Sequence, residues 1–354
     1  MEKELSIFCG TPSMSVVDAM QKIDQNVRGI LFVLDEHGTL AGCITDGDIR
    51  RWLIRTGDLR AEIGQFMNKT PVYISEDEQL LAKKKMKVES IHAIPVLDES
   101  KQIVRILFDE KYYGLRNAYA LKDIPVVIMA GGSGTRLYPY TKILPKPLIP
   151  IGDIPIAERI INQFRDFGCH TFHLVVNVKK NMIKAYFNEI EKDYEVFYAD
   201  EDTPLGTGGG LYLLKGKIDS TFILSNCDIL IQDDFEKMIA SHRKHKNMIT
   251  MVSSLKSYPI PYGVVHLGED GNLDSIEEKP QMSFLTNTGV YIIEPEVLNM
   301  IPENTFMGFP DIIEMVQKKG NRVGIYPVSE HAWLDMGQMN TLEEMRERLE
   351  NVAD

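Results

Sequence analysis

The residues with the clearest chemical potential are glycines and cations that follow an apolar run at 126–130. Residues 130–137 read Ala-Gly-Gly-Ser-Gly-Thr-Arg-Leu, and Pro-Lys-Pro stands at 145–147. A glycine loop after a strand lets backbone N–H groups approach phosphate oxygens closely. Arg136 can hold the β- and γ-phosphates as a fork, and Lys146 can reach the α-phosphate. The pattern therefore predicts a nucleoside triphosphate site.

Two commoner phosphate-binding motifs do not fit this loop. A P-loop ends in Gly-Lys followed by Ser or Thr, whereas Gly134 is followed by Thr-Arg. A Rossmann fingerprint needs a third small residue at the position that Arg136 occupies. The loop therefore represents a different class of nucleotide site.

Taken together, the loop and the Pro-Lys-Pro segment resemble the signature of the sugar-1-phosphate nucleotidyltransferases. The resemblance covers residues of about 124 to 350, and four later motifs stand in the family's order. These motifs are Leu-Gly-Thr-Gly-Gly at 205–209, Ser-Asn-Cys-Asp at 225–228, Glu-Glu-Lys-Pro at 277–280 and Trp-Leu-Asp-Met-Gly at 333–337. So many ordered motifs would rarely occur by chance.

The resemblance implies a role for each matching residue. It implies catalytic cations at Arg136, Lys146 and Lys279, and magnesium ligands at Asp228 and Asp335. The nucleotide contacts that it implies are Ala130, Gly131, Gly132, Gly134, Thr135, Leu205, Gly206 and Thr207. The sugar-phosphate contacts that it implies are Tyr262, Gly263, Glu278, Asn287 and Thr288.

The chemistry that these groups support is nucleotidyl transfer. A sugar-phosphate oxygen attacks the α-phosphorus of the triphosphate in line, and pyrophosphate leaves. Because the nucleophile is already anionic, no protein nucleophile or strong base is required, and catalysis consists of positioning and charge neutralisation. Mg²⁺ is the expected cofactor, since it takes one or two carboxylates together with substrate phosphates.

The motifs indicate the base and the sugar less directly than they indicate the reaction. Loops of the type Leu-Gly-Thr-Ala-Gly resemble those of guanylyltransferases, and Gly208 replaces the alanine. We expect GTP as the nucleotide; mannose-1-phosphate guanylyltransferase and uridylyltransferase activities are the alternatives. For glucosamine 1-phosphate, a carboxylate near the C2 ammonium is expected, and Glu278 is one candidate.

The first 120 residues contain an internal repeat. Residues 29–35 align without gaps over residues 92–98, at an offset of 63. Each repeat predicts the order helix, strand, turn, strand, helix, from apolar spacing of three to four and short β-branched runs. One such unit is too small to bury its apolar face alone, so two should pack as a pair.

This half resembles a tandem CBS pair, or Bateman module, with repeats at about 1–60 and 61–120. Residues 42–48 match the nucleotide signature of that family, which implies phosphate binding by Thr45 and ribose binding by Asp48. The second repeat has Phe108 and Lys111 at those positions. A regulatory nucleotide at the first repeat, or a role in assembling a homo-oligomer, is therefore expected.

The two halves together suggest a more specific resemblance. A CBS pair ahead of a nucleotidyltransferase domain is similar to the glucosamine-1-phosphate guanylyltransferases of bacterial legionaminic-acid pathways. The alternative from another class is a nucleotide-sensing CBS protein whose nucleotidyltransferase domain does not turn over. Such a domain should have lost phosphate or metal ligands, and here all are present.

The predicted fold is α/β: a tandem CBS module at 1–120, then a Rossmann-like catalytic domain at 121–354 with a mostly parallel mixed sheet. Strands are expected at 126–130, 171–178 and 221–224, and helices at 155–167 and 235–245. A terminal helix is expected from Thr341, where a capping box stands. His242 and His245 have metal-ligand spacing but no partner ligands, which predicts a solvated helix face.

Composition limits the partners. The 354-residue chain has 39 Lys and Arg against 51 Asp and Glu, a net charge of −12, which disfavours nucleic acid as a partner. The four cysteines form no Cys-x-x-Cys pair, and no apolar run is long enough to span a bilayer. We expect a cytoplasmic protein that binds neither nucleic acid nor membrane.

Overall fold

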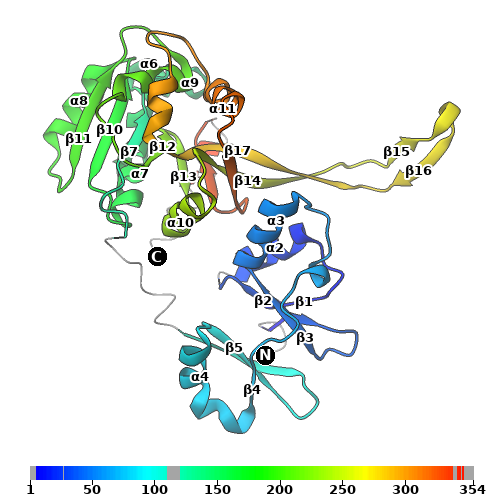
Figure 1. The fold of residues 1–354 in the computed structure, drawn as a ribbon. Helices are drawn as coiled ribbons and strands as arrows, with labels where there is room; N and C mark the ends of the chain where they lie inside the picture. The colour runs from blue at the N-terminus through cyan, green and yellow to red at the C-terminus, as the bar shows by residue number, and fades with distance from the viewer. Residues whose placement is uncertain (1–4, 27, 110–119, 338–340, 344, 347–354) are drawn as a thin grey trace. The chain divides into compact units, whose positions relative to one another are not determined.

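The computed structural model describes residues 5–26, 28–109, 120–337, 341–343 and 345–346. The chain forms two compact units (Figure 1). The first unit comprises residues 1–115 and 255–286, and the second comprises residues 116–254 and 287–354. The segment 255–286, which we call the arm, thus groups with the N-terminal unit, although the sequence analysis placed it in the C-terminal domain.

The first repeat folds as the apolar spacing predicts. It consists of β1 (Cys9–Gly10), α2 (Val16–Asn26), β2 (Ile30–Leu34), β3 (Leu40–Thr45) and α3 (Asp46–Thr56), followed by the short helix η1 (Ile63–Gln65). Strand β2 pairs in parallel with β1 and antiparallel with β3. Both helices bury one apolar face in the core of the repeat.

The second repeat copies this arrangement. Its elements are β4 (Ile74–Ser75), η2 (Glu76–Leu81), α4 (Ala82–Glu89), β5 (Ala93–Leu97) and β6 (Ile103–Phe108). Strands β5 and β6 lie 63 residues after β2 and β3, and they pair in the same sense. The repeat predicted at this offset is therefore confirmed. The helix expected after β6, with Lys111, lies outside the described residues.

A seven-stranded sheet forms the centre of the second unit, in the order β11-β10-β7-β12-β17-β14-β18. Strands β11, β10, β7 and β12 are mutually parallel, whereas β17 runs antiparallel to β12. The strands are β7 (Val126–Met129), β10 (Thr171–Val176), β11 (Glu195–Asp200), β12 (Phe222–Asn226), β14 (Ile249–Pro259), β17 (Gln281–Ile293) and β18 (Val323–Val328). The predicted mostly parallel sheet is confirmed.

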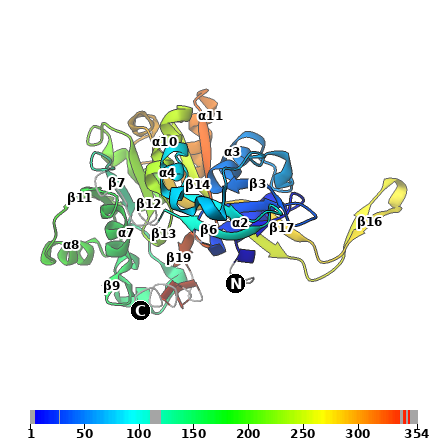
Figure 2. The same ribbon diagram turned by 90° about the horizontal axis from the view of Figure 1, so that it is seen from below.

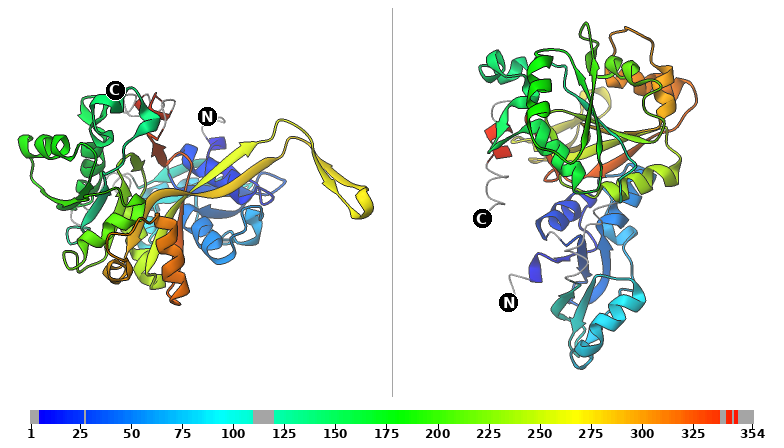
Figure 3. Two further views of the ribbon diagram at one scale, coloured as in Figure 1. Left: turned by 90° about the horizontal axis from the view of Figure 1, so that it is seen from above. Right: turned by 90° about the vertical axis from the view of Figure 1, so that its left-hand side faces the viewer.

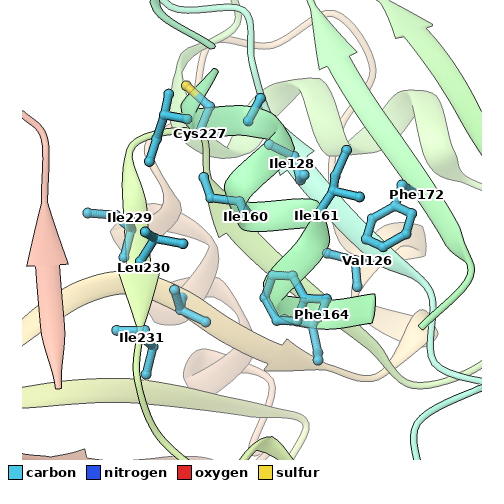
Figure 4. Close-up of a cluster of buried hydrophobic side chains, with 14 of the residues drawn as sticks. Val126, Ile128, Ile160, Ile161, Phe164, Phe172, Cys227, Ile229, Leu230 and Ile231 are labelled. Atoms are coloured by element: carbon cyan, nitrogen blue, oxygen red, sulfur yellow. The ribbon is translucent and has the colours of Figure 1, made fainter. Parts of the chain in front are cut away.

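Helices cover both faces of this sheet (Figure 3). On one face lie α7 (Ile156–Arg165), α8 (Lys180–Glu189) and α10 (Phe235–His245); on the other lie η5 (Gly210–Leu214), η7 (Pro295–Met300) and α11 (Phe309–Lys318). Each face of the sheet thus has its own hydrophobic core, and alternate residues of β7 point into one core or the other. Figure 4 shows the core on the α7 side, which contains Val126 and Ile128. The helices predicted at 155–167 and 235–245 are confirmed. None of the helices in the described ranges is long and apolar enough to cross a bilayer.

Short elements connect the strands and helices of this unit. They are η3 (Thr135–Leu137), α6 (Tyr140–Ile143), η4 (Lys146–Leu148), the hairpin β8 (Pro150–Ile151) and β9 (Ile154–Pro155), α9 (Gly206–Gly209), and the pair β13 (Ile229–Ile231) and β19 (Trp333–Asp335). The helix predicted from Thr341 falls largely outside the described residues, and the described positions 341–343 and 345–346 are helical.

The arm ends in a small ribbon of its own. Strands β15 (Val264–Leu267) and β16 (Leu273–Glu277) pair antiparallel, with η6 (Glu269–Gly271) between them, and they lie beyond the ends of β14 and β17 (Figure 2).

The prediction of a solvated face for His242 is wrong. The His242 side chain is fully buried, with Nδ1 2.8 Å from Thr250 Oγ1 and Nε2 2.8 Å from Glu294 Oε1. Thr221 Oγ1 also donates to Glu294, so this carboxylate, directly after β17, contacts both α10 and the residue before β12. The helical spacing of two histidines does not show whether they are buried or exposed. The hydrogen-bond partners of His242, which are Thr250 and Glu294, lie in other segments of the chain.

We expect Phe164→Ala to destabilise the second unit by about 3–5 kcal/mol, because it empties a fully buried site where the Phe164 ring lies 4.8 Å from that of Phe235. Urea unfolding followed by the fluorescence of Trp333, in a Trp52→Phe background, measures this unit. The control Phe197→Ala removes a ring that is half exposed and should cost roughly 1 kcal/mol or less. Equal losses in both variants would contradict the described core.

Candidate active site

The candidate site lies where β7, β10 and β12 end. The Ala130 backbone N–H donates to the Val175 carbonyl at 2.8 Å, so the loop at 130–137 leaves the sheet beside the end of β10. Gly132 has open space around it, and Thr135 and Arg136 are exposed at the start of η3. The loop thus presents backbone groups and a cation to solvent.

Glycine is required at position 134 for two reasons. Its φ is +64°, and an added Cβ would lie 2.8 Å from Thr141 Cγ2 and 3.0 Å from Lys146 Cβ. Thr141 Oγ1 donates to the Gly134 carbonyl at 3.0 Å. The tight turn therefore brings the glycine loop into contact with the Pro-Lys-Pro segment, and it fixes the base of the Lys146 side chain.

Lys146 and Asp228 form a buried ion pair. Lys146 begins η4 and is 9% exposed, and its Nζ contacts Oδ2 of Asp228, which is 7% exposed. Burial favours the neutral amine, but the neighbouring Cys227 and Asp228 outweigh it, so the pKa of Lys146 lies above its usual value. The cation therefore stays charged in a largely dehydrated position.

Asp335 lies next to this pair. In the β13–β19 ladder Ile229 stands opposite Asp335, and the Met336 N–H donates to the Asp228 carbonyl at 2.9 Å. Burial, and then the charge of Asp228, raise the pKa of Asp335, whereas the Gly337 N–H, Lys146 and Arg136 lower it. The structure thus brings together two carboxylates and two cations from four separate segments.

The donor set suits a hard divalent cation. Asp228 and Asp335 offer carboxylate oxygens, and burial together with the charge of Asp228 raises the pKa of Asp335. A cation between the two carboxylates would relieve their repulsion. Within the described ranges no cluster of three or more His, Cys, Asp or Glu side chains could hold a metal alone. Such a site fits Mg²⁺, which completes its shell with substrate phosphates and water.

A second loop, residues 205–209, is held by the segment before α11. Met307 accepts from the N–H groups of Gly208 and Gly209 at 3.0 and 3.2 Å, and Thr207 Oγ1 accepts from the Phe309 N–H at 3.0 Å. Leu205 accepts from the Met307 N–H at 3.0 Å. These contacts fix Leu205, Gly206 and Thr207 at the same end of the sheet as the glycine loop.

Two of the predicted sugar contacts belong to this unit. Thr288 is buried and its Oγ1 donates to the Val252 carbonyl at 2.8 Å; the Asn287 amide contacts the Tyr291 hydroxyl at 2.5 Å. The following Gly289 lies directly against Asn226, two residues before Asp228. Asn287 and Thr288 thus lie in the part of β17 that passes beside Asn226, close in sequence to Asp228.

The other sugar-phosphate predictions lie on the arm, in the first unit. An added Cβ on Gly263 would be 3.0 Å from Glu278 Oε2, and the Ile260 N–H donates to the Pro280 carbonyl at 2.9 Å. Tyr262 is 74% exposed, and Lys279 is exposed with a φ of +47°. Tyr262, Gly263, Glu278 and Lys279 are therefore side by side, in a different compact unit from Asp228 and Asp335.

Thr45 and Asp48 lie together at the start of α3. Thr45 is the N-cap: its Oγ1 accepts from the Asp48 N–H at 3.2 Å, and its own N–H donates to Asp48 Oδ2 at 2.9 Å. Arg51 pairs with the same carboxylate at 2.5 Å. Both residues thus have a capping role that the nucleotide signature does not reveal.

One residue of the site escaped the sequence analysis. Glu201 directly follows β11 and is 5% exposed, and its carboxylate lies against Gly131 of the glycine loop. The available signal was a carboxylate directly after a strand and four residues before Leu205. An acidic run at 200–202 is typical of an exposed turn, so composition alone pointed away from burial.

Two protein-family models match this chain. The model of the nucleotidyl transferase family matches residues 125–352, and that of the CBS domain matches residues 6–55. The chain belongs to the nucleotidyl transferase family, with a CBS domain at its N-terminus.

Curated relatives match over part of the chain. Mannose-1-phosphate guanylyltransferase catalytic subunit beta of Drosophila pseudoobscura pseudoobscura is 34% identical over 49% of this chain and 49% of its own length. Bifunctional protein GlmU of Methanococcus maripaludis is 32% identical over 56% and 48%. Mannose-1-phosphate guanyltransferase of Aspergillus oryzae is 32% identical over 60% and 60%. The chain thus spans about half to three-fifths of these relatives.

Solved structures give the same fold. HddC from Yersinia pseudotuberculosis is 25% identical with a TM-score of 0.51, over 64% of this chain and 99% of that chain. A second HddC structure, complexed with GMP-PN, has a TM-score of 0.50 at 25% identity over the same shares.

We expect the stability of Glu201→Gln relative to the parent to rise with pH. Burial raises the pKa of Glu201 to about 7. Between about pH 4.5 and 7, the folded parent therefore keeps a proton that the unfolded chain releases. The folded parent loses stability as the pH rises through this range. The glutamine variant lacks this loss. Melting temperatures from pH 4.5 to 8 measure it, with Glu195→Gln, on the exposed start of β11, as the control. A Glu201→Gln difference that stays constant with pH would contradict the buried placement.

Proposed function

We propose that this protein transfers a nucleotidyl group from a nucleoside triphosphate to a sugar 1-phosphate and releases pyrophosphate. The observation that carries the proposal is the convergence of Lys146, Asp228 and Asp335 beside the loop that holds Arg136. The catalytic domain is taken as residues 121–354, behind a CBS pair at 1–120. Membership of the nucleotidyl transferase family supports this reaction class.

In the proposed reaction, a phosphate oxygen of the sugar forms a bond to the α-phosphorus, and the bond between that phosphorus and the β-phosphate bridging oxygen breaks. The electron pair leaves with pyrophosphate. Lys146 neutralises charge on the α-phosphate, Arg136 holds the β- and γ-phosphates, and the backbone at 130–135 and 205–207 contacts the nucleotide. Mg²⁺ held by Asp228 and Asp335 would supply further neutralisation of the phosphates.

The arm residues complete the proposal for the sugar phosphate. Lys279 is assigned to the phosphate and Glu278 to the sugar hydroxyls or an amino group, with Tyr262 and Gly263 beside them. This assignment is supported by the motif and by the proximity of Gly263 to Glu278.

The proposed substrates are GTP and glucosamine 1-phosphate. Similarity to named mannose-1-phosphate guanylyltransferases and to HddC, solved with GMP-PN, supports a guanine nucleotide. Similarity to GlmU keeps uridylyl transfer as an alternative, and mannose 1-phosphate is the alternative sugar. We further propose a place in nonulosonic-acid synthesis of the legionaminic type, in the cytoplasm; this part of the proposal rests on the resemblance of the whole arrangement, a CBS domain ahead of the nucleotidyltransferase domain.

A pyrophosphate-release screen with Mg²⁺, four nucleoside triphosphates and several sugar 1-phosphates tests the reaction. We expect turnover with GTP, and a loss of about 10²–10³ in kcat for Lys146→Ala. The control Lys318→Ala removes an exposed cation of α11 and should keep full activity. No turnover with any pair would reject the enzyme and favour the alternative, a CBS sensor with a non-catalytic domain.

We also propose that Thr45 and Asp48 bind a regulatory adenine or guanine nucleotide and that the CBS pair assembles a homo-oligomer. A cap whose hydroxyl and carboxylate lie together at a helix N-terminus supports phosphate and ribose recognition. Titration of the full chain with AMP should show binding that Thr45→Ala/Asp48→Ala removes, with the melting temperature as a check on folding. If the parent chain binds none of AMP, ADP and ATP, an adenine nucleotide at Thr45 and Asp48 is rejected. Sedimentation of the full chain measures whether it forms a homo-oligomer.

A further inference from the structure

The turn after β10, residues 177–179, lies against the beginning of the glycine loop. The Val178 N–H donates to the Gly131 carbonyl at 3.5 Å, and an added Cβ on Gly131 would lie 3.2 Å from the Cβ of Asn177. Lys179 is the next residue and the N-cap of α8. The turn therefore borders the segment that the proposed function assigns to the triphosphate.

The Lys179 side chain binds the other end of the same segment. Its Nζ donates to the Thr141 carbonyl at 2.6 Å and to the Lys142 carbonyl at 2.9 Å. Both carbonyls belong to α6, and the last carbonyls of a helix lack donors from within the helix. Because an ammonium group has three donors, one lysine can bind both carbonyls at once.

Packing alone does not fix the position of α6. All four of its side chains are exposed or half-buried, and Ile143 is 74% exposed. A helix of a single turn is marginal by itself, because few hydrogen bonds offset the cost of ordering its residues. The position of α6 therefore depends on contacts such as the one that Lys179 makes with its carbonyls.

A series of contacts connects Lys179 to the predicted phosphate-binding cations. Thr141, whose carbonyl accepts from Lys179, donates through its Oγ1 to the Gly134 carbonyl at 3.0 Å. Gly134 directly precedes η3, which contains Arg136, and an added Cβ on Gly134 would lie 3.0 Å from the Cβ of Lys146. A displacement of α6 would therefore disturb the surroundings of both cations.

We propose that Lys179 is a positioning residue for the triphosphate. It holds α6 against the turn after β10 and thereby keeps Arg136 and Lys146 aligned on the phosphates. The inference rests on the proposed nucleotidyl transfer, and it adds a residue that none of the sequence motifs contains. Lys179 acts through the backbone of α6, so its loss should impair use of the triphosphate and spare the binding of the sugar phosphate, which is assigned to the arm.

The test measures pyrophosphate release by the parent, Lys179→Met and Lys179→Gly, with the nucleotide and sugar 1-phosphate that the screen identifies. Glycine readily adopts the φ of +54° found at this position, so Lys179→Gly removes the ammonium without straining the turn. We expect KM for the nucleotide to rise by roughly 10-fold, with a lower kcat, because the phosphate-binding groups lose their alignment. KM for the sugar 1-phosphate should change by less than about twofold.

Two further variants support the interpretation. Lys179→Arg keeps donors for both carbonyls and should recover most of the activity. The control Lys192→Met removes a contact of the same kind at the other end of α8, where Lys192 Nζ donates to the Phe187 carbonyl at 2.5 Å. It should leave both KM values unchanged. Melting temperatures of all variants check that each is folded.

The result that would overturn the inference is a KM for the nucleotide that stays at the parent value in both Lys179→Met and Lys179→Gly. A rise that is equal for the nucleotide and the sugar 1-phosphate would overturn it too, because it would show a general structural role. A parent with no turnover on any substrate pair instead rejects the proposed function itself, so the two failures are distinguishable.

Discussion

The arrangement of the candidate site depends on one buried ion pair, that of Lys146 with Asp228. Bringing two charges out of water is costly, and removing either partner leaves an unpaired buried charge. The surrounding fold is shaped to hold the pair. Gly134 is a glycine because its turn packs on the Lys146 side chain, and the β13–β19 ladder brings Asp335 beside Asp228. Segments 82 residues apart thus meet at one point.

The pair also sets what the site can do. The two carboxylates, Asp228 and Asp335, interact electrostatically with the two cations, Lys146 and Arg136. A ligand that carries only negative or only positive charge would therefore complement only half of these groups. A triphosphate with a divalent cation satisfies both kinds of group at once. Under the proposed function, Asp228 would help to hold the metal, and Lys146, now paired with Asp228, would be available to the α-phosphate. The acidic net charge of the chain is then compatible with a locally cationic phosphate cradle.

Much of the fold and part of the site could be predicted from the sequence. The glycine loop, the Pro-Lys-Pro segment and the repeat at an offset of 63 are local patterns, and local patterns determine turns, strands and registers. Glu201 and His242 could not be predicted correctly, because their burial depends on Gly131, Gly210, Thr250 and Glu294, which lie elsewhere in the chain. The grouping of the arm with the first unit is likewise a tertiary property.

The most direct test is a crystal structure with Mn²⁺ and a non-hydrolysable GTP analogue, in which anomalous scattering locates the metal. The predicted result is a manganese ion bound by Asp228 and Asp335, with Lys146 Nζ on an α-phosphate oxygen and no longer on Asp228. A metal bound away from both carboxylates, or a triphosphate out of reach of Lys146, would contradict the convergence on which the proposed chemistry depends.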